Sequence, residues 1–179
     1  MPRRSRAIAF SCPLIALLVS SCSESKISQC QKLLNVTNRI EPLNQEFKTQ
    51  VKKLQTTARP KGIKEVKSML HKTSDIFQKT ATKFIKISQE ARTLNLGDEK
   101  IKTWKIQYIN LLDKYQMNLT SLANLLLNAT QANTVNEFSA KFSKLENDGA
   151  SVFEQLPKLD NQKRKLDREI DSYCQKNQA

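Results

Sequence analysis

Residues 138–173 decide the fold, and they read FSAKFSKLENDGASVFEQLPKLDNQKRKLDREIDSY. Apolar side chains recur in this stretch at alternating spacings of four and three residues, which is the period of one face of an α-helix. The set is Phe138, Phe142, Leu145, Val152, Leu156, Leu159, Leu166, Ile170 and Tyr173, interrupted by Gly149 and Lys163. Pro157 lies within the stretch and is expected to bend the helix. The pattern therefore predicts one long C-terminal helix.

Three earlier segments show the same period. The first runs from Ile27 to Leu54, and its apolar register continues across Pro42, so we expect a kink there rather than a break. The second begins at Ile63 and ends at the turn 94–97. The third covers 101–129 and has Asp98 as its predicted N-cap. Thr134 and Glu137 have the spacing of a capping box at the start of the fourth segment.

The turns between these segments are short, and short turns make consecutive helices antiparallel neighbours. Only three glycines and five prolines occur in 179 residues, which argues against sandwiches and barrels with their frequent turns. We therefore expect an all-α fold, an elongated up-down-up-down four-helix bundle with coiled-coil-like seams. A single domain would cover residues 27–176, with the start of its first helix and the end of its last helix at the same end.

The first 21 residues have the pattern of an export signal. Arg3, Arg4 and Arg6 precede a mostly apolar run at 7–19, which is too short to span a membrane. The run ends in Leu18-Val19-Ser20-Ser21-Cys22-Ser23, which resembles the lipobox of bacterial lipoproteins. The resemblance implies that the signal peptide (1–21) is removed and that Cys22 carries diacylglycerol and an N-linked acyl chain such as palmitate. Residues 22–26 would then be a lipidated linker.

The same resemblance predicts the location. Several acyl chains anchor a protein stably, whereas a single chain does not. We expect an exported, lipid-anchored protein of the bacterial cell envelope. Because Ser23 rather than aspartate follows Cys22, the periplasmic face of the outer membrane is favoured if the host has two membranes. An ordinary signal peptide followed by a coincidental cysteine is the alternative.

Two of the four cysteines remain for the folded domain, because Cys12 lies in the signal and Cys22 in the lipobox. An even pair in an exported protein indicates a disulfide, here between Cys30 and Cys174. The predicted topology independently brings both to one end of the bundle. The alternative is two free thiols.

Basic residues outnumber acidic ones in the sequence, with 30 Lys+Arg against 17 Asp+Glu and a formal net charge of +13. On the second helical segment, lysines fall within one outward arc of about 100°, if each residue advances 100° around the axis. This lysine strip comprises Lys61, Lys64, Lys72, Lys79, Lys83 and Lys86. It is either a solvated outer face or a surface for an anionic partner, such as lipid headgroups or an acidic protein. No nucleic-acid partner is expected.

Catalytic and metal-binding patterns are scarce. His71 is the single histidine and lacks the Glu-x-x-His spacing of di-iron bundles, so we expect a surface or boundary residue. Ser23-x-x-Lys26 lacks the partner motifs of Ser-x-x-Lys enzymes. Trp104, Tyr108 and Tyr115 share one helix face, which indicates core packing or a ligand slot. We expect no metal and no cofactor.

These observations predict a membrane-anchored lipoprotein that is not an enzyme and acts as a scaffold, accessory or binding subunit. No motif assigns the bundle to a helical family, and the sequence does not predict its oligomeric state. A carrier or sensor for an apolar ligand is the first alternative, and it would need a cavity lined by residues such as Trp104, Phe77, Phe84 and Phe142. An enzyme is the second, and it would need a polar cleft with convergent titratable groups.

Overall fold

The computed structural model describes residues 24–57 and 62–175, and these residues form five α-helices. They are α1 (Lys26–Thr37), α2 (Ile40–Thr57), α3 (Ile63–Thr93), α4 (Glu99–Thr130) and α5 (Val135–Gln175). The prediction of an all-α helical bundle is confirmed. The proposed signal peptide, Cys22 and Lys61 lie outside the described residues.

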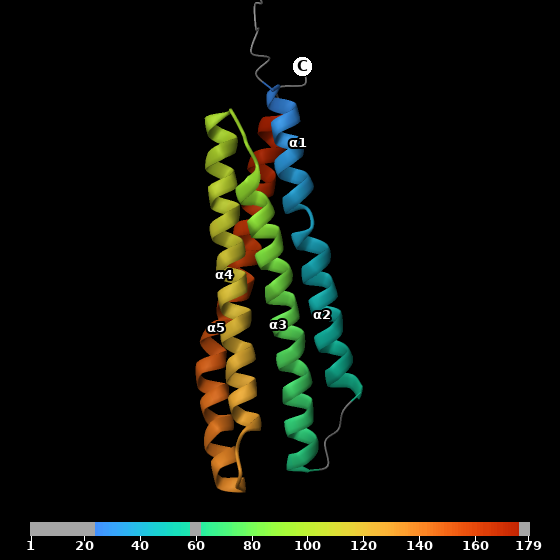
Figure 1. The fold of residues 1–179 in the computed structure, drawn as a ribbon, viewed down its shortest axis with the longest axis vertical. Helices are drawn as coiled ribbons and strands as arrows, with labels where there is room; N and C mark the ends of the chain where they lie inside the picture. Colours follow the sequence, from blue (N-terminus) through green and yellow to red (C-terminus); the bar gives the residue numbers. More distant parts are fainter. Residues whose placement is uncertain (1–23, 58–61, 176–179) are drawn as a thin grey trace, which may run out of the picture.

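The helices form an elongated bundle in which α1 and α2 together make the first of four antiparallel rods (Figure 1). The chain descends through α1 and α2, returns through α3, descends again through α4 and ends at the top with α5. Helix α4 packs most extensively, against α3 above all and then against α5, with a smaller contact to α1. The up-down-up-down order places the start of α1 beside the end of α5.

The first rod differs from the prediction. The sequence predicted a kink at Pro42, whereas the rod is broken at residues 38–39, before the proline. Helix α1 ends at Thr37, Asn38 and Arg39 form a turn, and α2 begins at Ile40. Pro42 thus lies in the first turn of α2, where a backbone N–H would have no partner within the helix. The proline fits a helix start, and this explains why the interruption falls before it rather than at it.

The predicted caps of α4 and α5 are present. The Asp98 carboxylate accepts hydrogen bonds from the backbone N–H groups of Lys100, at 3.0 Å, and Ile101, at 3.1 Å. Thr134 Oγ1 accepts from the N–H of Glu137, at 3.2 Å. Glu137 in turn accepts from the N–H of Asn133, one residue before the position that a standard capping box uses. Pro157 lies inside α5, which continues through it to Gln175.

The core follows the apolar seams and is densest along α4. Ile101, Tyr108, Leu111, Leu112 and Leu122 are at most 1% exposed. The aromatic rings of α3 and α4 meet at mid-height, where Phe84 stacks on Tyr115 with ring centroids 4.9 Å apart. Both interruptions of the α5 seam, Gly149 and Lys163, are buried. The seam therefore holds one charged side chain, whose partners are described below.

Candidate functional site

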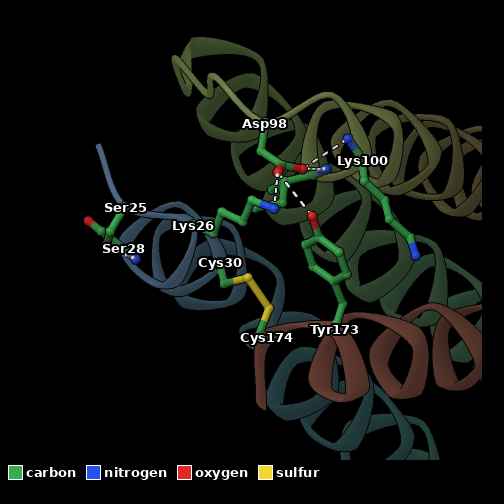
Figure 2. Close-up of a disulfide and its surroundings, with 9 residues drawn as sticks. Ser25, Lys26, Ser28, Cys30, Asp98, Lys100, Tyr173 and Cys174 are labelled. Atoms are coloured by element: carbon green, nitrogen blue, oxygen red, sulfur yellow. Dashed lines mark hydrogen bonds and ion pairs between the residues drawn. A yellow bond between two sulfur atoms is a disulfide. The ribbon is translucent and has the colours of Figure 1, made fainter. Parts of the chain in front are cut away.

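The two cysteines of the folded domain join the first helix to the last. The sulfurs of Cys30 and Cys174 are 2.03 Å apart and their Cα atoms 6.2 Å apart, in the range of a disulfide. Both cysteines are buried. The predicted pair is therefore found at bonding distance, at the end of the bundle where the chain enters α1 (Figure 2).

A polar network surrounds this disulfide (Figure 2). Asp98 accepts a hydrogen bond from the Tyr173 hydroxyl at 3.0 Å and lies 3.8 Å from the Lys26 ammonium. Partial burial raises the pKa of the Asp98 carboxyl, but its hydrogen bonds from Ile101, Tyr173 and Lys100 and the charge of Lys26 outweigh that effect. The net result is a pKa below the ordinary value. Asp98 is thus held as an anion that ties three helices together.

The chain enters the bundle one residue earlier than predicted. Ser25 is the N-cap of α1, and its hydroxyl accepts from the N–H of Ser28 at 3.2 Å. Lys26, which the sequence placed in the linker 22–26, is the first helical residue. Cys22 and Ser23 lie outside the described residues, so the lipidation site and the Ser-x-x-Lys pattern stay predictions from the sequence. The start of α1 is nevertheless only four residues from Cys22.

The described members of the lysine strip are all exposed on α3, as predicted. Lys83 is paired with Glu46 of the neighbouring helix α2, with its ammonium 2.6 Å from the carboxylate. Lys64, Lys72, Lys79 and Lys86 make no ion pair with a described residue. The strip therefore has one cation engaged in holding α2 on α3 and four that face outward.

Three side chains of α4 reach carboxylates of α5 along one seam. The Tyr108 hydroxyl donates to Asp167, and the Tyr115 hydroxyl donates to Asp160. Trp104 Nε1 donates to Glu169 at 3.3 Å. Burial, with the neighbouring carboxylate, raises the pKa of each tyrosine above its ordinary value, so both stay protonated donors. Of the two roles predicted for Trp104, Tyr108 and Tyr115, core packing or a ligand slot, their burial matches core packing. Each of the three also has a polar partner on α5.

The sequence did not predict these carboxylates as partners. Asp160 and Asp167 are seven residues apart and so share a face of α5, which is the signal that could have found them. Lys163 lies between them with its side chain 7% exposed, and its ammonium is 2.6 Å from Asp167. Asn44 of α2 donates to Asp160 at 3.2 Å and Lys48 lies 3.5 Å from it. The seam is thus a chain of partly buried polar contacts linking α2, α4 and α5.

The aromatic residues expected around an apolar ligand lie at different heights of the bundle. Trp104 packs against Tyr173 near the disulfide, with ring centroids 5.2 Å apart, whereas Phe142 stacks on Phe138 near the start of α5. Phe84 lines a cavity of about 40 Å³ between α2, α3, α4 and α5. A cavity of this size holds about three or four water molecules at most, given that one needs at least ~10–15 Å³.

His71 is exposed, and its Nδ1 is 3.5 Å from Asp75. Within residues 24–57 and 62–175, no group of three His, Cys, Asp or Glu side chains is placed to hold a metal ion. In the same ranges, no helix is both long and apolar enough to cross a bilayer. The described residues thus define a disulfide-linked, all-α helical bundle. Comparisons of the chain with protein families, curated proteins and solved structures find no match.

Proposed function

We propose that the protein is a lipid-anchored bacterial envelope lipoprotein that binds a partner and is not a catalyst. The anchor would be acylated Cys22, and the location the periplasmic face of the outer membrane in a host with two membranes. The bundle would be a scaffold, accessory or binding subunit that the anchor holds at the membrane surface.

The observation that carries this proposal is the Cys30–Cys174 pair at bonding distance. Disulfides persist in oxidising compartments outside the cytoplasm, which is where a signal peptide of the lipobox type would deliver the chain. Cys30 follows Cys22 by eight residues, so the disulfide end of the bundle would face the membrane. The helices extend away from that end (Figure 1), so most of the exposed surface of α3 would lie away from the bilayer.

The lysine strip supports a partner that carries negative charge. Four of its described cations face outward without an ion pair to a described residue, so their charge is not cancelled locally. Unpaired surface cations attract an anionic protein surface over a Debye length of about 10 Å at 0.1 M salt. We propose an acidic protein of the envelope as the partner of this strip.

The anchor is tested by Cys22→Ala in the full chain. The expected result is that the variant stays unprocessed or leaves the membrane fraction, whereas Cys12→Ala behaves as the wild type. Mass spectrometry of the mature N-terminus should find a diacylated and N-acylated cysteine. An unmodified mature chain that starts at another residue contradicts the proposal.

The strip is tested by crosslinking in native membranes. We expect Lys72→Glu, Lys79→Glu and Lys86→Glu together to abolish the salt-sensitive capture of an acidic protein while helicity is kept, because exposed substitutions change stability within about ±0.5 kcal/mol each. Lys52→Glu, Lys114→Glu and Lys158→Glu form a matched control with the same charge change on exposed positions elsewhere. Equal capture by both triple variants would show that the strip is only a solvated face.

A further inference from the structure

A second basic surface lies at the disulfide end, and it is concave. A groove of about 440 Å³ runs between the start of α4 and the end of α5. We call it the Trp104 groove, and its lining is Lys100, Trp104, Lys165, Arg168, Glu169 and Ser172. The lining combines three cations with one carboxylate, a hydroxyl and an indole ring. The groove is shallow and open, with Trp104 buried at its floor and the other five lining residues exposed.

The one carboxylate of the groove is already engaged. Glu169 accepts the hydrogen bond from Trp104 Nε1 and lies 3.9 Å from the Lys165 ammonium. Neither Lys100 nor Arg168 forms an ion pair with a described carboxylate. Arg168 Nε donates to the backbone oxygen of Arg164, which leaves the terminal guanidinium nitrogens as donors. An anion entering the groove would therefore meet cations that need no prior release from a carboxylate.

Aromatic rings position the Lys100 cation. Its ammonium lies 5.2 Å from the centroid of the Trp104 ring and 4.7 Å from that of Tyr173. Cation–π contacts of this kind hold a lysine in place without neutralising its charge. Lys26 lies over the same Tyr173 ring at 5.6 Å. Figure 2 shows Lys26, Lys100 and Tyr173 grouped around Asp98 beside the disulfide.

The groove lies where the proposed anchor would enter the bilayer. Tyr173, which packs on Trp104, precedes the disulfide residue Cys174, and Lys26 is four residues after Cys22. Indole and phenol rings prefer the boundary between headgroups and acyl chains, and cations near it attract anionic lipids. Both features occur here at the same end of the bundle.

We propose that the Trp104 groove binds the phosphate of an anionic phospholipid headgroup in the membrane that holds Cys22. The guanidinium of Arg168 can donate two parallel hydrogen bonds to phosphate oxygens, and Lys100 and Lys165 supply point charges. Ser172 supplies a hydroxyl donor. This inference rests on the proposed anchoring, and it adds that the bundle docks on the surface in one orientation rather than swinging freely on its linker.

Trp104 is the single tryptophan of the chain, which makes it a specific reporter. The acylated full chain is placed in vesicles of phosphatidylcholine with or without phosphatidylglycerol, each carrying a spin label on the lipid headgroup. We expect quenching of Trp104 fluorescence in the anionic vesicles and no quenching in the neutral ones. High salt should reduce the quenching as well, because exposed charges are screened.

The variants locate the effect. Lys100→Gln together with Arg168→Gln should bring quenching in anionic vesicles down to the level in neutral vesicles. Lys52→Gln together with Lys114→Gln removes the same charge from exposed positions outside the groove and the lysine strip, and should leave quenching unchanged. Circular dichroism checks that each pair keeps the helical content, and if the first pair unfolds, Lys165→Gln alone should give a partial loss.

Three results overturn the proposal. They are equal quenching in anionic and neutral vesicles, wild-type quenching in the groove variants that remain folded, and saturation of the groove by inorganic phosphate with no effect of the lipid. The last outcome would identify a free anion as the ligand. Failure of the anchor gives a different result, since the wild-type chain would then not sediment with neutral vesicles. A chain that sediments without Trp104 quenching keeps its anchor and loses only the docking proposed here.

Discussion

The hydroxyl of Tyr108 donates a hydrogen bond to Asp167, and the same carboxylate pairs with the buried ammonium of Lys163 at 2.6 Å. One carboxylate thus serves two partners, one on α4 and one on its own helix. Lys163 takes a position at which the apolar repeat of α5 calls for an aliphatic side chain. Asp167 thus ties α5 to α4 through Tyr108, whereas its pair with Lys163 lies within α5 and keeps the buried ammonium paired.

Removing the carboxylate should cost more than removing the whole pair. Asp167→Ala leaves the Lys163 ammonium unpaired in the core and removes one hydrogen-bond partner of the Tyr108 hydroxyl, so we expect a loss of about 3 kcal/mol in the free energy of unfolding. Lys163→Met with Asp167→Leu replaces both charges by apolar groups and should lose much less. Urea unfolding of Lys163→Met, Asp167→Leu and the double variant measures the coupling. Additive losses would contradict the pairing.

The sequence predicted the helical rods, their antiparallel order and the Cys30–Cys174 contact, because each depends on periodicity and short turns. The caps at Asp98 and Thr134 were predictable for the same reason, since capping is local chemistry. The break at residues 38–39 was not, because the apolar register continues across it and Pro42 suits a kink as well as a helix start.

The polar seam and the Trp104 groove depend on which faces of α4 and α5 meet, and this is a tertiary property. Asp160 and Asp167 read in sequence as ordinary solvated acids, and their tyrosine partners lie 45 and 59 residues away. The lysine strip could be predicted because its described members all lie on α3. The groove could not, since Lys100 and Arg168 come from different helices.

Reduction of the disulfide should lower stability. The chain-entropy relation gives roughly 5 kcal/mol for a closed loop of this length, and measured losses are often smaller. We expect a lower Tm for the wild type in dithiothreitol and the same lower Tm for Cys30→Ser with Cys174→Ser in either buffer. A dithiothreitol-induced shift that persists in the double variant would show that the effect comes from elsewhere.

The free energy of unfolding should depend on pH through Asp98. Its pKa is lowered in the folded protein, so its contribution is fully present above the ordinary carboxyl pKa of about 4 and is lost as the pH falls through the folded value. Asp98→Asn keeps a capping side chain without the charge. We expect the stability advantage of the wild type over this variant to shrink between pH 5 and pH 2. Asp98→Ala also removes the cap and should cost about 1 kcal/mol at neutral pH.

Gly149 offers a test of the packing between α5 and α4. It is buried in the middle of α5, where glycine destabilises a helix by roughly 0.5–1 kcal/mol relative to alanine. A Cβ atom at this position would meet Leu122 Cδ2 at 3.7 Å and Leu145 Cδ1 at 3.8 Å, which are ordinary van der Waals distances. The two helices therefore have room for a methyl group.

Gly149→Ala should raise the free energy of unfolding, measured by urea denaturation, by roughly 0.5–1 kcal/mol. Gly149→Leu is the contrasting variant, because its larger side chain exceeds that space and should destabilise the bundle. If alanine also destabilises, α5 lies closer to α4 than the geometry described here.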